Sequence, residues 1–91
     1  MIKGADVVIE NYRPGVKHRL GIDYDTLSAV NSRLIYGSIS GFGQHGLYRD
    51  RPGFDQIAQG MGGLMSITGE AGHGPMRVGI PIDDLCAGMF L

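Results

Sequence analysis

Two adjacent aspartates, Asp83 and Asp84, are the residues of this sequence whose position best suits covalent chemistry. They precede the apolar stretch Leu85 to Leu91, which has the composition of the first turns of a helix. A carboxylate at a helix N-terminus, partly removed from water, is suited to act as a nucleophile. The same placement is typical of an N-cap and a first-turn charge that only stabilise the helix. Neighbouring side chains there point in different directions, so one acid at most is expected to serve a site.

A second polar group, Asn11-Tyr12-Arg13-Pro14-Gly15, directly follows the expected strand Val7 to Ile9. It combines an amide, an aromatic ring and a cation at the carboxyl end of a strand, where open α/β sheets bind ligands. Tyr12 can stack on a nucleotide base, and Arg13 and Arg19 can pair with phosphate. The alternative is a polar turn with solvated arginines, which the local chemistry alone favours.

A third candidate is Gly41-Phe42-Gly43-Gln44-His45-Gly46, which has the spacing of a dinucleotide-binding glycine motif. That motif must open a helix whose N-terminus holds pyrophosphate. Here it runs into residues 47–53, which cannot form a good helix. We therefore expect an irregular, functional loop at residues 41–53 instead of a nicotinamide or flavin site.

The elements that position these groups follow from local patterns. Pro14 suits the first position of a helix that Gly21 ends, and Asp23 is a plausible N-cap for a helix from Tyr24 to Val30. With the β-branched strand 7–9 before them and a strand at 34–40 after them, they form a βαβ unit. Such a unit predicts a parallel sheet whose strands are buried on both faces. Beyond it we expect a helix at 54–65, a turn-rich loop at 68–74 and an extended segment at 77–82.

Composition excludes several classes of function. The chain has 91 residues, one cysteine, sixteen glycines and a net charge of -1. One cysteine allows no internal disulfide, and no Cys/His spacing indicates a metal site. The charge gives no reason to expect nucleic acid or an anionic membrane as a partner. With neither a long apolar run nor a signal peptide, we expect a soluble, cytoplasmic protein.

Single reactive residues carry little evidence of function. His18, His45 and His73 form no compelling catalytic order, and Cys86 is expected to be a small buried hydrophobe. The three methionines of the helical stretches are expected in the core, namely Met61, Met65 and Met89. A strand begins almost at the first residue, and the last helix has barely begun at Leu91. We therefore expect a segment of a larger domain, truncated at both ends.

Taken together, the motifs resemble those of the family III CoA-transferases. Residues 6–15 are similar to their A-D-V-x-x-E-N-[FY]-x-P-G stretch, and 31–36 resemble N-P-R-L-I-Y with Ser32 in place of proline. Residues 38–43 match S-I-S-G-F-G, and 51–55 match R-P-G-[FY]-D. Residues 77–82 with Asp84 match the segment that ends at the family's catalytic aspartate. The resemblance covers essentially the whole chain in the right order.

The resemblance implies that residues 1–91 are part of the large, Rossmann-like α/β domain of a CoA-transferase, which forms an interlocked homodimer. It implies transfer of coenzyme A between carboxylic acids, with CoA as a substrate and no resident cofactor. Asp84 matches the nucleophile, which forms an acyl anhydride and then an aspartyl-CoA thioester. Asp83 stands where many members have a neutral residue. The positions implied to contact CoA are Asn11, Tyr12, Arg13, Arg19, Ser40, Gly41, Phe42 and Gly43.

Two alternatives stay open. The α-methylacyl-CoA racemase branch of the same superfamily has a histidine base in a G-H-D triplet, where this chain has Gly53-Phe54-Asp55. Phenylalanine cannot shuttle a proton, which disfavours racemisation or another isomerisation. The other alternative is a truncated, inactive chain that binds CoA weakly or not at all, because its strands lack their neighbours.

Overall fold

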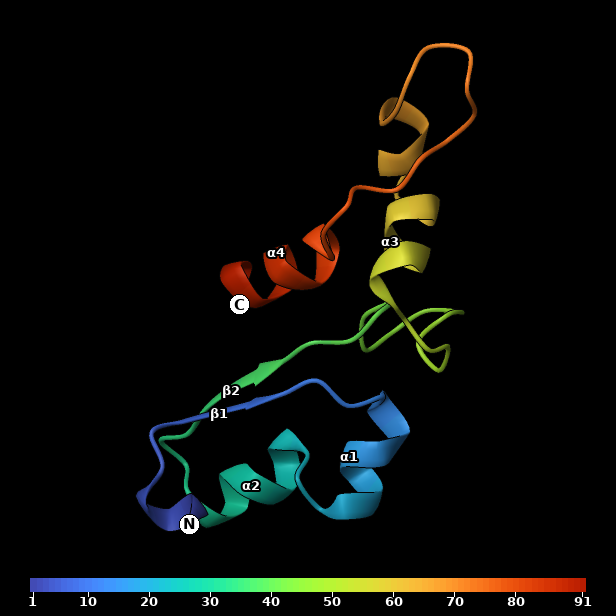
Figure 1. Cartoon of the computed structure of the whole chain (residues 1–91). Helices are drawn as coiled ribbons and strands as arrows, with labels where there is room; N and C mark the ends of the chain where they lie inside the picture. The colour runs from blue at the N-terminus through green and yellow to red at the C-terminus, as the bar shows by residue number, and fades with distance from the viewer. The chain divides into compact units, whose positions relative to one another are not determined.

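The computed structural model describes all 91 residues, which divide into two compact units (Figure 1). The first unit is Met1–Pro52 with Leu91, and the second is Gly53–Phe90. The first contains the short 3-10 helix η1 (Ile2–Gly4), β1 (Val7–Glu10), α1 (Pro14–Leu20), α2 (Tyr24–Val30) and β2 (Ile35–Ser38). The second contains α3 (Asp55–Met61), the 3-10 helix η2 (Leu64–Ile67) and α4 (Ile82–Phe90).

Strands β1 and β2 form a two-stranded parallel sheet, which confirms the βαβ prediction. The register pairs Val7 with Ile35 and Glu10 with Ser38. β2 is shorter than the predicted strand 34–40, although the Ile39 N–H still donates to the Glu10 carbonyl at 2.9 Å. The carboxyl ends of both strands therefore meet at one edge, where the predicted binding segments begin.

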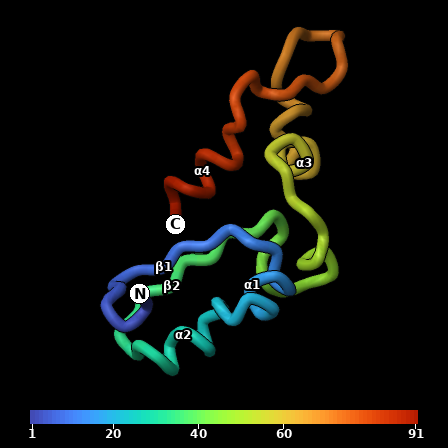
Figure 2. The backbone as a smooth tube through the Cα atoms, turned by 60° about the horizontal axis from the view of Figure 1, so that its bottom comes forward, coloured from blue at the N-terminus to red at the C-terminus, as the bar shows by residue number.

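Within the first unit, helices cover one face of this sheet. Helices α1 and α2 lie on the same side of the two strands in both views of the backbone (Figures 1 and 2). On the other side Val7, Ile9 and Ile35 are 51%, 64% and 66% exposed. The prediction of a strand buried on both faces is therefore wrong for this chain, because the helices of the first unit lie on one face only.

Local signals end and begin the two covering helices as predicted. Pro14 is the first residue of α1, and Gly21 ends it with φ of 66°, a left-handed conformation that glycine adopts without strain. The Asp23 carboxylate accepts the Thr26 N–H at 3.1 Å and caps α2. Lys17 of α1 contacts Glu10 and Ser38, the last residues of the two strands, so α1 lies at their carboxyl ends.

The predicted helix 54–65 is too long by one turn. α3 ends at Met61, and Gly63 then has φ of 85°, which no residue in a right-handed helix adopts. The chain continues as η2 instead. Met61 and Met89 are exposed in this chain and Met65 is half-buried, so the expected place of these methionines in a core is not found here.

Substitution of two glycines in this segment should have opposite effects on the free energy of unfolding. Gly63→Ala should lower it by about 1 kcal/mol, because the left-handed conformation strains a residue with a Cβ. Gly60→Ala should raise it by up to about 1 kcal/mol, because Gly60 lies inside α3. A Cβ there would meet only the Met65 sulfur at 3.5 Å. Urea unfolding of the whole protein measures both, and equal shifts in the same direction would contradict the assignment of the helix end.

The segment 77–82, predicted to be extended, forms no strand, and its last residue already begins α4. Asp83 and Asp84 lie in the first turn of α4, as predicted. No helix of the chain is both long enough and apolar enough to cross a bilayer.

Candidate functional site

The expected site residues fall into the two units of the fold. Asp84 belongs to Gly53–Phe90, and the eight positions expected to contact CoA belong to Met1–Pro52.

Asp84 is exposed in the first turn of α4 and makes no hydrogen bond or ion pair with another side chain of this chain. Asp83 beside it is half-buried, and its N–H donates to the Asp55 carboxylate at 2.9 Å. The two acids thus differ in exposure and in their backbone contacts. A carboxylate with no partner, near the positive end of a helix, is available for attack on an electrophile.

Asp55 and Gln59 form a buried pair that makes hydrogen bonds to the segment leading into α4. Asp55 is 7% exposed and Gln59 is fully buried. The Gln59 Nε2 donates to Asp55 Oδ2 at 2.7 Å, and its Oε1 accepts the Val78 N–H at 2.8 Å. With the contact from the Asp83 N–H, the pair ties α3 to the chain on both sides of residue 80.

Our sequence analysis did not predict this pair. A local signal was present, because Asp55 and Gln59 are four residues apart and share one face of α3. Two polar residues at that spacing beside apolar Ile57 and Met61 are compatible with a buried hydrogen-bonded pair. Their hydrogen-bond partners outside α3, the N–H groups of Val78 and Asp83, come from the following segment.

The segment Asn11–Arg13 lies at the edge of the first unit, with its three side chains exposed. The Arg13 guanidinium donates to the Asp50 carbonyl, so this segment contacts the loop 41–53. Arg19, on α1, is also exposed and has no carboxylate partner in the chain. The exposed Asn11, Tyr12 and Arg19 side chains, and the remaining N–H groups of Arg13, can meet a ligand with an aromatic base and phosphates.

The glycine loop after β2 is irregular, as predicted. Ser40 accepts a hydrogen bond from Gln44 Nε2 at 3.1 Å, and Gly43 has φ of 79°. Phe42 packs edge-to-face on Tyr48 with ring centroids 5.7 Å apart. No helix follows until α3, which agrees with the rejection of a dinucleotide-binding motif. The loop exposes its backbone at Gly41 and Gly43.

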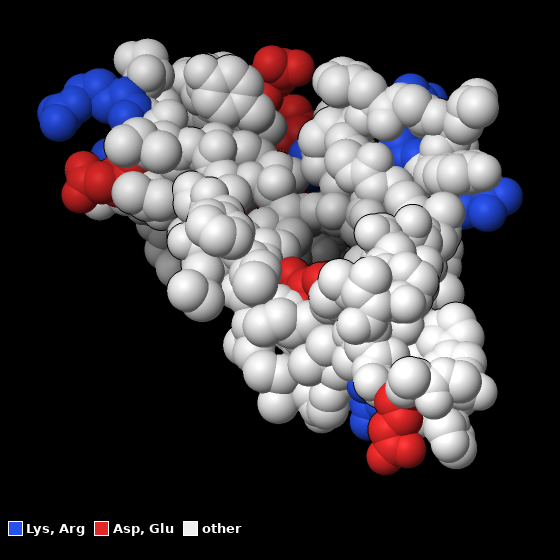
Figure 3. Space-filling model, turned by 90° about the horizontal axis from the view of Figure 1, so that it is seen from above, with Lys and Arg blue, Asp and Glu red and all other residues white.

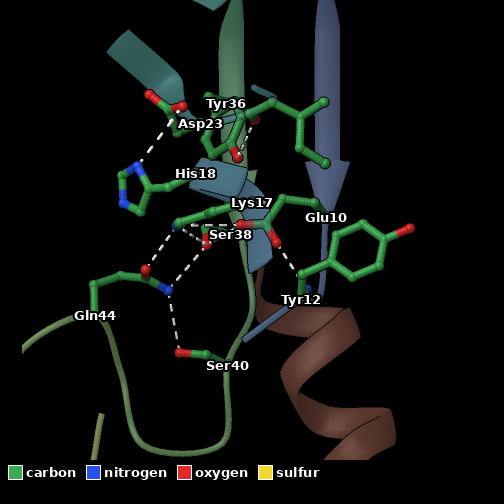
Figure 4. Close-up of polar contacts among 10 residues, drawn as sticks. Glu10, Tyr12, Lys17, His18, Asp23, Tyr36, Ser38, Ser40 and Gln44 are labelled. Atoms are coloured by element: carbon green, nitrogen blue, oxygen red, sulfur yellow. Dashed lines mark hydrogen bonds and ion pairs between the residues drawn. The ribbon is translucent and has the colours of Figure 1, made fainter. Parts of the chain in front are cut away.

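Beneath both segments lies a buried polar cluster that our sequence analysis missed (Figure 4). Glu10 and Lys17 are only 6% and 7% exposed. Lys17 Nζ donates to Glu10 Oε1 at 3.3 Å, to Ser38 Oγ at 3.0 Å and to Gln44 Oε1 at 2.6 Å. The Ser38 hydroxyl also donates to Glu10 Oε1. The signal in the sequence was an acid ending a β-branched strand, with a lysine in the helix that follows it.

The cluster sets the ionisation of two groups. Burial raises the pKa of Glu10, but hydrogen bonds from Ser38, the Tyr12 N–H and Lys17 together outweigh burial and lower it. Burial and the negative charge of Glu10 raise the pKa of Tyr36 to about 12. The Tyr36 hydroxyl donates to the Ile22 carbonyl at 2.8 Å and stays protonated at neutral pH. Glu10 is therefore a carboxylate and Tyr36 a neutral phenol under ordinary conditions.

A surface cavity of about 580 Å³ adjoins this cluster, and Lys17 and Gln44 form part of its wall. Asp23, His45 and Arg49 also line it, so both an acid and a cation face the cavity. Charged side chains on the face in Figure 3 are likewise scattered in small groups of both signs among uncharged atoms. The chain contains no cluster of three or more residues suited to bind a metal ion.

Comparison with known proteins identifies the family. The family model described as CoA-transferase family III matches residues 1–91. This chain belongs to CoA-transferase family III. It is 47% identical over 90 residues to the succinate–glutarate CoA-transferase of Agrobacterium fabrum, covering 99% of this chain and 22% of the relative. It is 49% identical over 92 residues to the acetyl-CoA:oxalate CoA-transferase of Acetobacter aceti, covering 100% and 24%.

Solved structures agree on the fold. A CaiB/BaiF family protein from Brucella suis superposes with a TM-score of 0.92 at 45% identity, covering 98% of this chain and 24% of that one. Rv3272 from Mycobacterium tuberculosis superposes with a TM-score of 0.87 at 30% identity, covering 99% and 25%. The predicted resemblance to CoA-transferase family III and the α/β class are confirmed. This family III chain spans about a fifth to a quarter of the length of its relatives.

Proposed function

We propose that the whole protein transfers coenzyme A between carboxylic acids, with Asp84 as its nucleophile. The observation that carries the proposal is an exposed, unpartnered Asp84 in the first turn of α4, in a chain that matches the CoA-transferase family III model over its full length. The curated relatives named above are CoA-transferases for succinate and glutarate or for oxalate. They support a small carboxylic acid as the acceptor class.

The reaction begins when a carboxylate oxygen of Asp84 attacks the carbonyl carbon of an acyl-CoA thioester. The C–S bond breaks, which leaves a mixed anhydride on Asp84 and a free CoA thiolate. The thiolate then attacks the aspartyl carbonyl, releases the donor acid as a carboxylate and leaves an aspartyl-CoA thioester. The acceptor carboxylate reverses both steps, takes the CoA and regenerates Asp84. Covalent catalysis of this kind replaces one difficult step by several easier ones.

The remaining predicted residues bind CoA in this proposal, which needs no resident cofactor. Tyr12 stacks on the adenine, Asn11 donates to the nucleotide, and Arg13 and Arg19 pair with phosphates. Ser40, Gly41, Phe42 and Gly43 line the loop beside them, and exposed glycine N–H groups can donate to a developing oxyanion. We further propose a cytoplasmic location and an interlocked homodimer for the whole protein.

The second candidate function is racemisation or isomerisation of an acyl-CoA. It needs a base at the position of Phe54, which is exposed at the N-cap of α3 and has no group that can accept a proton. The third candidate is a truncated, inactive chain that binds CoA weakly or not at all. Phe54 argues against the second candidate, and an exchange experiment separates all three.

One incubation in D₂O tests the proposal. The whole protein is mixed with succinyl-CoA and ¹³C-labelled glutarate or oxalate, and the thioesters are analysed by mass spectrometry. Label is expected in the CoA thioester, with no deuterium at the α-carbon of the donor. Deuterium without transfer of CoA would support the isomerase. Neither change in the whole protein, with a panel of acyl-CoA donors and acids, would contradict both enzymatic candidates. The same incubation of residues 1–91 alone, with neither change, would support the inactive chain.

A further inference from the structure

One buried carboxylate serves both segments that are expected to contact CoA. Glu10 Oε2 accepts the Tyr12 N–H at 2.8 Å and so fixes the turn that carries Asn11–Arg13. Its other oxygen, Oε1, accepts hydrogen bonds from Ser38 and from Lys17 (Figure 4). Ser38 ends the strand that precedes the glycine loop, and Lys17 contacts Gln44 within that loop. The two segments therefore share one anchoring group.

Lys17 extends this anchor into the loop. Its ammonium group donates to Gln44 Oε1 at 2.6 Å, and Gln44 Nε2 donates in turn to Ser38 Oγ at 3.0 Å and to Ser40 Oγ at 3.1 Å. Gln44 directly follows Gly43, which has φ of 79° and, without a Cβ, restricts the loop backbone less than other residues would. A single lysine thus restrains a loop that glycine would otherwise leave mobile.

The cluster is complete as a hydrogen-bonding network. No buried side-chain nitrogen or oxygen of the chain lacks a partner. Burying an ion pair brings little net stability over an apolar pair, because both charges must be dehydrated. A buried pair with every hydrogen bond satisfied is better explained by the geometry that it imposes, here on two loops that emerge at one sheet edge.

We infer that Glu10 and Lys17 are positioning residues that hold Asn11–Arg13 and Ser40–Gly43 in a single arrangement ready to bind CoA. This inference rests on the proposed function, since it names CoA as the ligand of the two segments. In this role neither residue needs to touch the reacting atoms. They act by removing the entropy that the loops would otherwise lose on binding.

Two variants of the whole protein test the inference. Lys17→Met removes the ammonium group and keeps an apolar stem, while Gln44→Ala leaves the buried ion pair intact and detaches only the loop. Lys3→Met is the matched control, because Lys3 is exposed on η1. The readouts are the Kd for CoA by calorimetry, KM and kcat for transfer, the Tm, and hydrogen exchange of the amides of residues 40–44.

Both variants should raise Kd and KM by about tenfold, the effect of losing one charge-assisted hydrogen bond, with kcat changed much less. Amide exchange in residues 40–44 should become faster without CoA, and Lys3→Met should match the parent in every readout. A merely structural role would lower the Tm of Lys17→Met and leave Kd and loop exchange in Gln44→Ala unchanged, which would overturn the inference. If Lys17→Met does not fold, Gln44→Ala decides alone.

Failure of the proposed function looks different. A parent protein that neither binds nor transfers CoA would overturn that function and the ligand named here. A parent that binds CoA, with a Gln44→Ala variant of equal affinity and equal loop exchange, would overturn only the positioning role.

Discussion

The Asp84→Asn variant of the whole protein is expected to lose transfer of CoA by about a thousandfold or more. The amide that replaces the carboxylate is almost the same size, but it cannot attack a thioester to form an anhydride. Because Asp84 is exposed and unpartnered, the substitution should leave the Tm unchanged. The rate of label exchange between an acyl-CoA and a free acid measures the loss.

Asp83→Asn is the matched control, since it removes the same charge from the neighbouring residue. It should keep most of the activity, because the Asp83 contact with Asp55 uses its backbone N–H and not its carboxylate. Hydroxylamine added during turnover should convert the activated aspartate to a hydroxamate, which peptide mass spectrometry should locate at Asp84. Full activity in Asp84→Ala, or a hydroxamate at Asp83, would refute the assignment.

The elements that follow from neighbouring residues were predictable from the sequence. Pro14, Gly21 and Asp23 set the ends of α1 and α2 through contacts within one turn, and all three do so in the structure. The parallel pairing of β1 and β2 followed from the short helical connection between them. Signals of this kind need no knowledge of the rest of the fold.

The length of the third helix was not predictable in the same way. An apolar repeat from Ile57 to Met65 continues past Gly62 and Gly63, and the repeat alone cannot tell whether a glycine will stay helical. The structure shows that Gly63 takes a left-handed conformation, which ends the helix despite the pattern. A glycine costs a helix only about 1 kcal/mol, so tertiary contacts decide between continuation and a break.

The polar clusters could not be predicted because their members are far apart in the sequence. Lys17 is 7, 21 and 27 residues from Glu10, Ser38 and Gln44. Each side chain alone has the appearance of a solvated surface group, and only the meeting of two strand ends, a helix and a loop buries them together. The family motifs pointed to Asn11–Arg13 and Ser40–Gly43, because a motif is read from residues in sequence order. They gave no sign of the buried cluster that contacts both segments.

The Asp55→Ala variant should lower the free energy of unfolding of the whole protein by about 3 kcal/mol. Asp55 is buried, and its two carboxylate oxygens accept separate hydrogen bonds from Gln59 Nε2 and the Asp83 N–H. Removing the side chain leaves the Asp83 N–H without its acceptor. It also removes one hydrogen bond of the fully buried Gln59 amide. Urea unfolding followed by circular dichroism measures the loss.

The variant Asp55→Asn should lose about half as much, because one amide oxygen remains as an acceptor while the charge that favours the N-terminus of α4 is gone. Gln56→Ala is the surface control, since Gln56 is exposed on the same turn, and it should change stability by less than about 0.5 kcal/mol. Equal urea midpoints for Asp55→Ala and Gln56→Ala would contradict the role of this carboxylate. Because the Asp83 N–H lies one residue before Asp84, a loosened first turn of α4 should also lower kcat for transfer in Asp55→Ala. Gly63→Ala destabilises the protein at a position remote in sequence from that turn, so it should leave kcat unchanged.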